Sequence, residues 1–209
     1  KQPDRMVIDF GSTNVTGIHV KAVENLRIHY GLEQKPVLVT DPSQMLGEVD
    51  EELAEILGVG VKGAFGRKNA FGFDNTGPVK EYLTPWGQTL LVPEGFCTTT
   101  DAQGDVLMYP EGDVSANPSA KMPRSGYFFD SIIRQQPIEE DKLDPADNLE
   151  EYGPISDADL DYWRETTQKA RATGKAVIAG FGGTALGDIA HIPGKKLKHP
   201  KGIRDITEW

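Results

Sequence analysis

Two stretches of the sequence combine a short apolar run with a loop of glycine, hydroxyl and amide residues that could hold a ligand. They are Met6–Gly17, MVIDFGSTNVTG, and Ala176–Asp188, AVIAGFGGTALGD. Hydroxyl and amide side chains donate hydrogen bonds to ligand oxygens, and glycine lets the backbone turn sharply and approach a ligand closely. This chemistry suits the binding of a small polar or anionic molecule.

The apolar runs that precede the two loops predict the strands that position them. Met6–Phe10 predicts a first strand, and Ala176–Ala179, bounded by Gly174 and Gly180, predicts a strand buried on both faces. In parallel α/β architectures, ligands bind just beyond the carboxyl ends of the strands. We therefore expect the two loops to face one pocket, although tight turns between strand and helix would explain the same pattern.

The first loop supplies six candidate substrate-binding residues. They are Asp9, Ser12, Thr13, Asn14, Thr16 and His19. Asp9 ends the first predicted strand, where its carboxylate could orient a substrate or cap the following turn. The hydroxyl and amide side chains could bind a ligand oxygen or cap the next helix. His19 could reach the pocket as an acid, a base or a ligand, or it could pack at the start of that helix.

The second loop supplies four more candidates. They are Gly182, Gly183, Thr184 and Asp188. Backbone amides at the start of a helix can hold an anion, and Asp188 could face the ligand or cap the helix. The run GFGGTALG has the wrong glycine spacing for a dinucleotide fingerprint, and no acidic residue closes a following strand. NAD binding is therefore not expected.

Other reactive or aromatic residues carry weaker signals. Cys97 has no CxxC partner and no nearby histidine, so neither a metal site nor a nucleophile is expected there. His191 and His199 flank a loop rich in Pro, Gly and Lys and are interpreted as surface residues. The run Phe128–Asp130, FFD, could form a lid, or its aromatic residues could anchor a long loop.

Charge and composition exclude several classes of function. The chain has 209 residues, a formal net charge of −10 and one cysteine. An acidic surface repels phosphate backbones, so no nucleic-acid partner is expected. No apolar run approaches the roughly 20 residues that span a bilayer, and the first residues lack a signal-peptide pattern. A single cysteine excludes an internal disulfide and suits a reducing compartment, so the sequence predicts a cytoplasmic location.

Hydrophobic spacing predicts an α/β chain with a β-rich insertion. Helices are expected over Val20–Tyr30, from Asp41 to Gly58 and from Ser156 to Gly174, and further strands over Pro36–Val39 and Val59–Phe65. Two hairpins, turning near Trp86 and at Asp101–Gly104, predict an antiparallel meander within an insertion over residues 81–126. The acidic stretch Pro137–Glu151 is expected to be a solvated linker.

Several segments resemble one protein family in their order and spacing. They are VIDFGSTNVTGIHV, DPSQMLGEVDEELAEILGV, YLTPWGQTLLVPEGFCTTTDAQGDVLMYPEGD, SGYFFD and GFGGTALGDIAHIPG. The family is the uroporphyrinogen decarboxylase-like superfamily, in its branch of bacterial methyltransferases that act with corrinoid proteins. The resemblance covers nearly all of this chain but only about half of a family member.

The resemblance implies a fold and a reaction. The fold is the amino-terminal part of a (β/α)8 TIM barrel, with its pocket at the carboxyl ends of the strands. The reaction moves a methyl group between a small methylated compound and a corrinoid protein, which carries the cobalamin. Family members commonly use zinc, bound by His, Cys or carboxylate ligands, as a Lewis acid. The resemblance places those ligands in the half of the barrel that follows this chain, so no metal ligand is expected within it.

Two other functions stay open. Uroporphyrinogen decarboxylases grip substrate carboxylates with an arginine-rich loop after the first barrel strand, whereas the matching stretch here, GSTNVTGIH, contains no arginine. A tetra-anionic porphyrinogen needs cationic partners, so a metal-free decarboxylase is the second choice. The third is a non-catalytic half-barrel, either a fragment or a subunit completed by another chain or by self-association.

Overall fold

The structure of the protein, a computed structural model, describes residues 6–180 and 194–205. These residues form two compact units, of which the first comprises 6–67, 78–92 and 156–180, and the second 68–77, 93–155 and 194–205. The fold is mixed α/β, as expected, but the described residues form no closed barrel. Within the same residues, no helix combines the length and the apolar character needed to cross a membrane.

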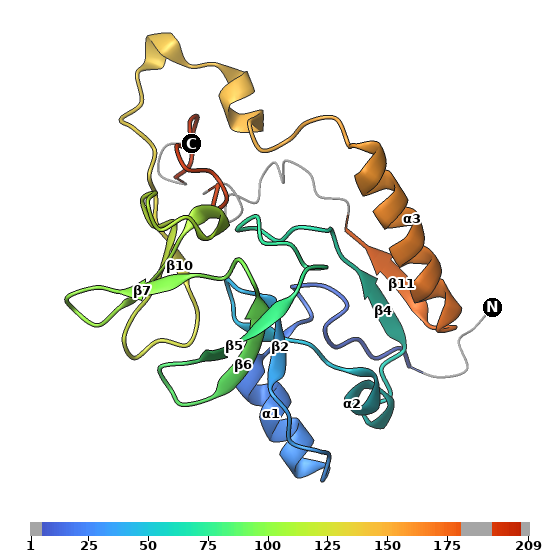
Figure 1. Ribbon diagram of the computed structural model, residues 1–209. Coiled ribbons are helices and arrows are strands. Elements are labelled where there is room, and N and C mark those ends of the chain that lie inside the picture. Colours follow the sequence, from blue (N-terminus) through green and yellow to red (C-terminus); the bar gives the residue numbers. More distant parts are fainter. Residues whose placement is uncertain (1–5, 181–193, 206–209) are drawn as a thin grey trace. The chain divides into compact units, whose positions relative to one another are not determined.

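A five-stranded sheet forms a large part of the first unit (Figure 1). Its strand order is β1 (Ile18–His19), β3 (Leu46–Gly47), β2 (Val37–Asp41), β6 (Thr89–Pro93) and β5 (Val79–Leu83). Strand β3 pairs antiparallel with both β1 and β2, whereas β2 and β6 run parallel. The Thr84 amide donates a hydrogen bond of 2.9 Å to the Gln88 carbonyl oxygen and closes the turn between β5 and β6. The first predicted hairpin is therefore confirmed.

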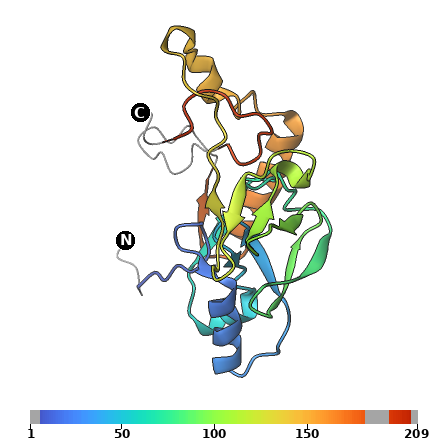
Figure 2. The same ribbon diagram turned by 90° about the vertical axis from the view of Figure 1, so that its left-hand side faces the viewer.

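Helix α1 (Val20–His29) follows β1 directly and nearly matches its predicted range. It packs against β2 (Figure 2), and its residues Val20 and Val23 are buried. The Gln88 side-chain amide donates a hydrogen bond of 3.2 Å to the Val20 carbonyl oxygen, which joins the β5–β6 turn to the start of the helix. Gly31, with a φ of +68°, follows the helix as the sequence predicted.

A second sheet of the first unit contains parallel strands. β4 (Val61–Ala64) pairs in parallel with β11 (Ala176–Ala179), and helix α3 (Asp157–Ala172) packs against both (Figure 1). Just before β4, Gly60 donates a hydrogen bond to the Ile8 carbonyl oxygen and accepts one from the Ala176 amide, both at 2.9 Å. Ile8 also forms a parallel bridge with Val59, so the Ile8 segment and β11 both run parallel to the chain around β4.

Both predicted strands that precede the candidate loops are weaker than expected. Met6–Phe10 forms only a single parallel bridge, between Ile8 and Val59, and Met6 is 82% exposed. The expectation that Ala176–Ala179 is buried on both faces is wrong, because exposed and half-buried residues alternate along it and Ile178 is 42% exposed. The physical reason is that, among the described residues, β11 pairs with β4 and packs against α3. Helix α3 covers only one face of the strand, so the other face stays partly exposed.

The single helix predicted from Asp41 to Gly58 is wrong. The Asp41 carboxylate accepts hydrogen bonds from the amides two and three residues further on, at 2.7 and 3.3 Å, which makes a tight turn. Met45 then adopts a φ of +51°, which is incompatible with a continuing right-handed helix. The helix begins only after Asp50, as α2 (Glu51–Ile56).

The β-rich region predicted over residues 81–126 is divided between two sheets. Its first hairpin, β5–β6, belongs to the sheet of the first unit, whereas the second unit has its own antiparallel sheet. That sheet contains β7 (Thr98–Thr100), β8 (Val106–Met108), β9 (Ala120–Met122) and β10 (Asp130–Ser131). The turn between β7 and β8 lies at Asp101–Gly104, as predicted.

A chain of aromatic side chains fills the core of the second unit. Phe71 stacks on Phe73 with ring centroids 5.6 Å apart, and Phe73 meets Phe96 edge-on at 6.1 Å. Phe96 in turn meets Phe129 at 6.5 Å. Such offset and edge-to-face pairs each add to the stabilisation that burial provides.

Short 3-10 turns carry the remaining irregular segments of the second unit. They are η1 (Pro110–Gly112), η2 (Glu140–Lys142) and η3 (Pro145–Leu149). The last two lie in the stretch predicted to be a solvated linker. That expectation is wrong at its end, because the side chains of Glu150 and Glu151 are only 21% and 14% exposed and form ion pairs.

Helix α3 offers a direct test of a local stabilising contact. Ser156 caps it, and its hydroxyl oxygen accepts a hydrogen bond of 3.1 Å from the Asp159 amide. Ser156→Ala removes this acceptor and is expected to lower the free energy of unfolding by about 1 kcal/mol. Urea denaturation followed by circular dichroism measures the change. Ser156→Thr, which keeps a hydroxyl, should stay close to the wild type, and equal losses in both variants would contradict the capping role.

Candidate functional site

The loop Gly11–Thr16, called here the first loop, lies against the carboxyl end of β4. A Cβ atom placed on Gly63 of β4 would lie 2.2 Å from the Ser12 carbonyl oxygen, which is closer than such atoms can approach. The absence of a side chain at Gly63 therefore lets the loop rest directly on the strand. Because the Ile8 segment, β4 and β11 run in one direction, this is the edge at which ligands bind in parallel α/β proteins.

Asp9 and Ser12 form the base of the first loop. Asp9 Oδ1 accepts a hydrogen bond of 3.2 Å from the Ser12 amide, and Asp9 Oδ2 accepts one from the Ser12 hydroxyl. Ser12 is only 4% exposed. The carboxylate of Asp9 therefore caps the turn that follows it, which is one of the two roles that the sequence left open.

Thr13 and Thr16 close the loop around its tip. Each threonine hydroxyl oxygen accepts a hydrogen bond of 3.3 Å from the amide of the other residue, and the two hydroxyl oxygens lie 3.2 Å apart. The Gly11 amide also donates a hydrogen bond of 2.9 Å to the Thr16 carbonyl oxygen. These contacts leave Asn14 and Val15 exposed at the tip. Asn14 thus presents an amide to solvent at this edge of the sheet.

His19 caps helix α1. Its Nδ1 atom accepts a hydrogen bond of 3.2 Å from the Lys21 amide, and its ring centroid lies 5.6 Å from that of Trp86. His19 therefore occupies the helix start, which is the structural alternative to an acid, base or ligand role.

The structure does not describe the candidate residues of the second loop. Gly182, Gly183, Thr184, Asp188 and His191 all lie outside the described residues. The expectation that the two loops face one pocket therefore stays a prediction.

The remaining candidates from the sequence lie in the second unit. Cys97 is a free, half-buried thiol, and His199 is exposed. Phe129 is 4% exposed and packs edge-on against Phe96, whereas Phe128 is 54% exposed. Of the lid and anchor alternatives, the anchor is confirmed for Phe129, and Asp130 begins the short strand β10.

Arg67 was missed by sequence reasoning. It follows β4 by three residues, and its Nε atom lies 3.3 Å from Oδ1 of Asp159, in the first turn of α3. The side chain of Arg67 is 39% exposed, although its Nε atom is buried. It places a positive charge beyond the same strand end that the first loop contacts. An arginine shortly after a predicted strand was the available signal, but its partner on α3 could not be read from the sequence.

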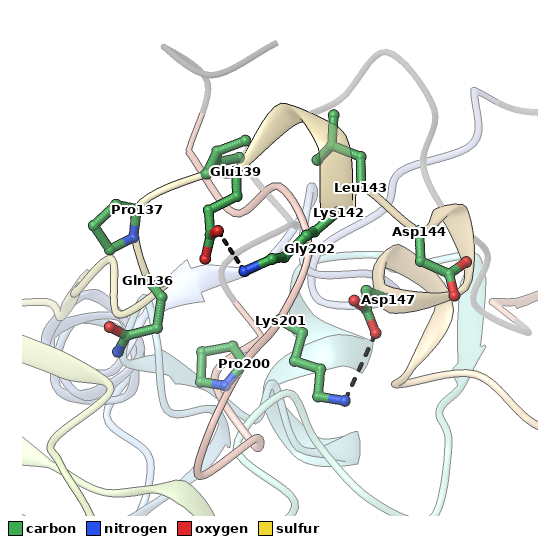
Figure 3. A pocket seen from close by; sticks show the side chains of 11 residues that line it. Gln136, Pro137, Glu139, Lys142, Leu143, Asp144, Asp147, Pro200, Lys201 and Gly202 are labelled. Carbon is green, nitrogen blue, oxygen red and sulfur yellow. Dashed lines mark ion pairs between the residues drawn. The ribbon is translucent and has the colours of Figure 1, made fainter.

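One hollow of the second unit has a volume of about 190 Å³ (Figure 3). Ion pairs cross it between Glu139 and Lys142 at 2.5 Å and between Asp147 and Lys201 at 3.8 Å. None of the substrate-binding residues expected from the sequence lines this hollow. Four of its five charged side chains thus pair with one another, and the fifth, Asp144, accepts a hydrogen bond from the Ala146 amide, so we assign the hollow no ligand.

Metal binding can be tested on the side chains directly. Within residues 6–180 and 194–205, no group of three or more His, Cys, Asp or Glu side chains is arranged to hold a metal ion. The residues that the structure describes therefore do not make up a zinc site. Comparison with known proteins adds no constraint, because no family model, curated protein or solved structure matches this chain.

Proposed function

We propose that this chain is part of a methyltransferase of the uroporphyrinogen decarboxylase-like superfamily. The enzyme moves a methyl group between a small methylated compound and a corrinoid protein in the cytoplasm. In this proposal the chain supplies the amino-terminal part of a (β/α)8 barrel. The first loop and the loop after β11 line one end of the substrate pocket.

The observation that carries the proposal is the position of the first loop. It rests on Gly63 at the carboxyl end of β4, within a set of parallel segments that includes β11. Strands β4 and β11 run parallel and α3 packs against both, as in the strand–helix–strand units of such barrels, although β5 to β10 lie between β4 and α3 in the chain. Together with the five sequence segments that resemble the family, this arrangement supports a pocket at that edge.

The chemistry of this edge favours methyl transfer over porphyrinogen decarboxylation. The first loop presents the Asn14 amide, which suits a small polar substrate. A tetra-anionic porphyrinogen requires several cationic side chains to bind its carboxylates. Near the strand ends we place one such side chain, Arg67. Zinc, where the family uses it, supplies Lewis-acid chemistry, but the described residues do not form its site and we derive no step through it.

Since this half of the barrel alone is expected to be inactive, the test is a demethylation assay with this chain together with the half that the resemblance expects to follow it, and a corrinoid protein in its reduced Co(I) state. A methoxylated aromatic, a methylamine and a betaine are supplied in turn. We expect one of them to yield the demethylated product, measured by mass spectrometry, together with an equal amount of methylated corrinoid, measured by absorbance. Release of CO₂ from a porphyrinogen without demethylation would favour the decarboxylase instead. Neither reaction would favour a non-catalytic half-barrel.

A further inference from the structure

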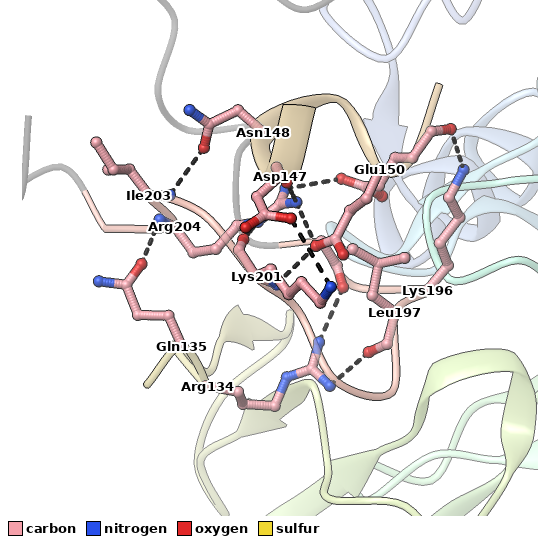
Figure 4. Close-up of polar contacts among 12 residues, drawn as sticks. Arg134, Gln135, Asp147, Asn148, Glu150, Lys196, Leu197, Lys201, Ile203 and Arg204 are labelled. Atoms are coloured by element: carbon pink, nitrogen blue, oxygen red, sulfur yellow. Dashed lines mark hydrogen bonds and ion pairs between the residues drawn. The ribbon is translucent and has the colours of Figure 1, made fainter. Parts of the chain in front are cut away.

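A polar network in the second unit joins two segments that are distant in the sequence (Figure 4). We call residues 194–205 the basic segment, because they contain Lys195, Lys196, Lys198, Lys201 and Arg204. We call residues 134–151 the acidic segment, because most of its charged residues are Asp or Glu. The basic segment forms no helix or strand within the described residues, so other contacts must hold it in place.

Arg204 is the centre of this network. The residue is 2% exposed, and its guanidinium lies 2.6 Å from Oε1 of Glu150 and 3.2 Å from Oε2 of Glu151. Its Nε atom also donates a hydrogen bond of 2.6 Å to the Lys201 carbonyl oxygen, and one terminal nitrogen donates one of 3.1 Å to that of Asp147. One guanidinium therefore joins two carboxylates and two carbonyl groups from both segments.

The backbone of the basic segment is held by side chains of the acidic segment. The Lys201 amide donates a hydrogen bond of 2.7 Å to Oε1 of Glu150, and the Ile203 amide donates one of 2.8 Å to Oδ1 of Asn148. In the other direction, the guanidinium of Arg134 donates hydrogen bonds of 2.8 and 2.7 Å to the carbonyl oxygens of residues 194 and 197. These bonds take the place of a helix or strand ladder.

The lysines of the basic segment also have partners. Lys196 Nζ donates a hydrogen bond of 3.0 Å to the Glu151 carbonyl oxygen, and Lys201 Nζ lies 3.8 Å from the Asp147 carboxylate. Two further lysines contact other parts of the second unit. Lys195 Nζ lies 5.8 Å from the centroid of the Phe71 ring, and Lys198 Nζ lies 2.5 Å from Asp113 Oδ2.

The charged groups around Arg204 have little access to solvent, so the charged state of each is stabilised mainly by its oppositely charged neighbours. Burial raises the pKa of the Glu151 carboxyl, against the opposing charges of Lys196 and Arg204. Burial likewise lowers the pKa of the Arg134 guanidinium, which the charge of Glu151 opposes. Removing one partner would leave the others charged with little water to solvate them.

We propose that the basic segment is an electrostatic clasp: it docks on the acidic segment as one cooperative unit, and Arg204 is its release point. Neutralising Arg204 frees residues 194–205 together, while the antiparallel sheet of the second unit stays folded. The acidic segment is thus a docking surface for a basic peptide, and the chain occupies it with its own residues 194–205. This proposal is independent of the proposed methyl transfer.

Hydrogen exchange followed by mass spectrometry tests the clasp. In Arg204→Gln, we expect peptides that cover 194–205 to exchange at least tenfold faster than in the wild type, whereas peptides that cover β8 stay within twofold. Lys201→Gln is the matched control, because its side chain is 68% exposed and its ion pair is long. It should leave both rates within twofold. Arg204→Lys, which keeps the charge but loses the planar fork, should fall between Arg204→Gln and the wild type.

Two results would overturn the proposal. One is unchanged exchange of residues 194–205 in Arg204→Gln. The other is faster exchange of β8 to the same extent, which would make Arg204 a residue of global stability. If Arg204→Gln does not fold, the wild type decides the question in guanidinium below its unfolding midpoint. There, the amides of 194–205 should open at a lower denaturant concentration than those of β8, and simultaneous opening would contradict the clasp.

Discussion

Asp50→Ala is expected to lower the free energy of unfolding of the first unit by about 3 kcal/mol, as is usual when one partner of a buried ion pair is removed. The side chain of Arg27 is 3% exposed, and its guanidinium lies 2.6 Å from Asp50 Oδ2. The same carboxylate caps α2, since Oδ1 accepts a hydrogen bond of 3.0 Å from the Leu53 amide. Asp50→Ala therefore has two effects: it takes one carboxylate partner away from the buried Arg27 guanidinium, and it removes the cap of helix α2.

Glu52→Ala is the matched control for this prediction. Glu52 also pairs with Arg27, at 3.0 Å, but its side chain is 54% exposed. Exposed ion pairs contribute little, so the loss should stay below about 1 kcal/mol. Urea denaturation, with hydrogen exchange of α1 to report on the first unit, measures both variants. If both variants lost the same free energy of unfolding, the contribution of Asp50 would not depend on the burial of its ion pair.

The contribution of Asp50 should also depend on pH. Burial is the largest influence on this carboxyl and raises its pKa, but hydrogen bonds from Lys35 and the Leu53 amide and the charge of Arg27 together outweigh it and hold the pKa below its ordinary value. A carboxyl with a lowered pKa in the folded state stabilises the fold above its unfolded pKa, near 4, and loses that contribution as the pH falls through its folded pKa. The stability difference between wild type and Asp50→Asn should therefore narrow below about pH 4. A constant difference down to acid pH would contradict an ionised Asp50.

Gly63→Ala is expected to have the second large effect, a loss of about 2–3 kcal/mol in the free energy of unfolding. The added Cβ would lie 2.2 Å from the carbonyl oxygen of Ser12 and 2.8 Å from its carbonyl carbon. Both are backbone atoms, so no side-chain rotation relieves the clash. The first loop must move away from β4, and the proposed methyl transfer should slow as well, because the loop would no longer hold its position at the pocket edge.

Gly60→Ala separates this contact from the general cost of a side chain next to β4. A Cβ on Gly60 would lie 3.8 Å from the nearest atom, a methyl carbon of Val7, which is ordinary contact. This variant should lose less than about 1 kcal/mol and keep its activity. Thermal unfolding and the demethylation assay measure both variants. Equal behaviour of the two would mean that the first loop does not rest on Gly63 in solution.

Local signals in the sequence were sufficient for elements whose ends carry a cap or a tight turn. Helix α3 begins after Ser156, and α1 ends before Gly31, where the sequence placed them. The hairpin turns near Trp86 and at Asp101–Gly104 were also predicted. Capping and turn formation depend on residues within a few positions of one another, so a single sequence contains the necessary information.

Hydrophobic spacing gave a wrong prediction where residues at helical spacing were buried by elements other than a helix. Met45 and Leu53 follow helical spacing and both are fully buried, yet a turn and a short strand separate Met45 from α2. The apolar run Ala176–Ala179 was expected to be covered on both faces, but its coverage depends on which elements pack there. Periodicity reports which residues are buried and does not report which distant elements bury them.

For this protein the sequence alone determined the α/β class, most helix ends, the hairpin turns and the residue types of the first loop. Only the tertiary structure decided that Asp9 is engaged by Ser12, that His19 caps α1, and that Gly63 lies beneath the loop. It alone brought Arg204 to Glu150 and Glu151, across more than fifty residues of chain. The physical reason is that the contacts of Gly63 and Arg204 join residues far apart in the sequence, and their energy depends on burial that no local pattern encodes. The contacts of Asp9 and His19 are local, but the sequence offered a ligand role for the same side chains and could not choose between the two.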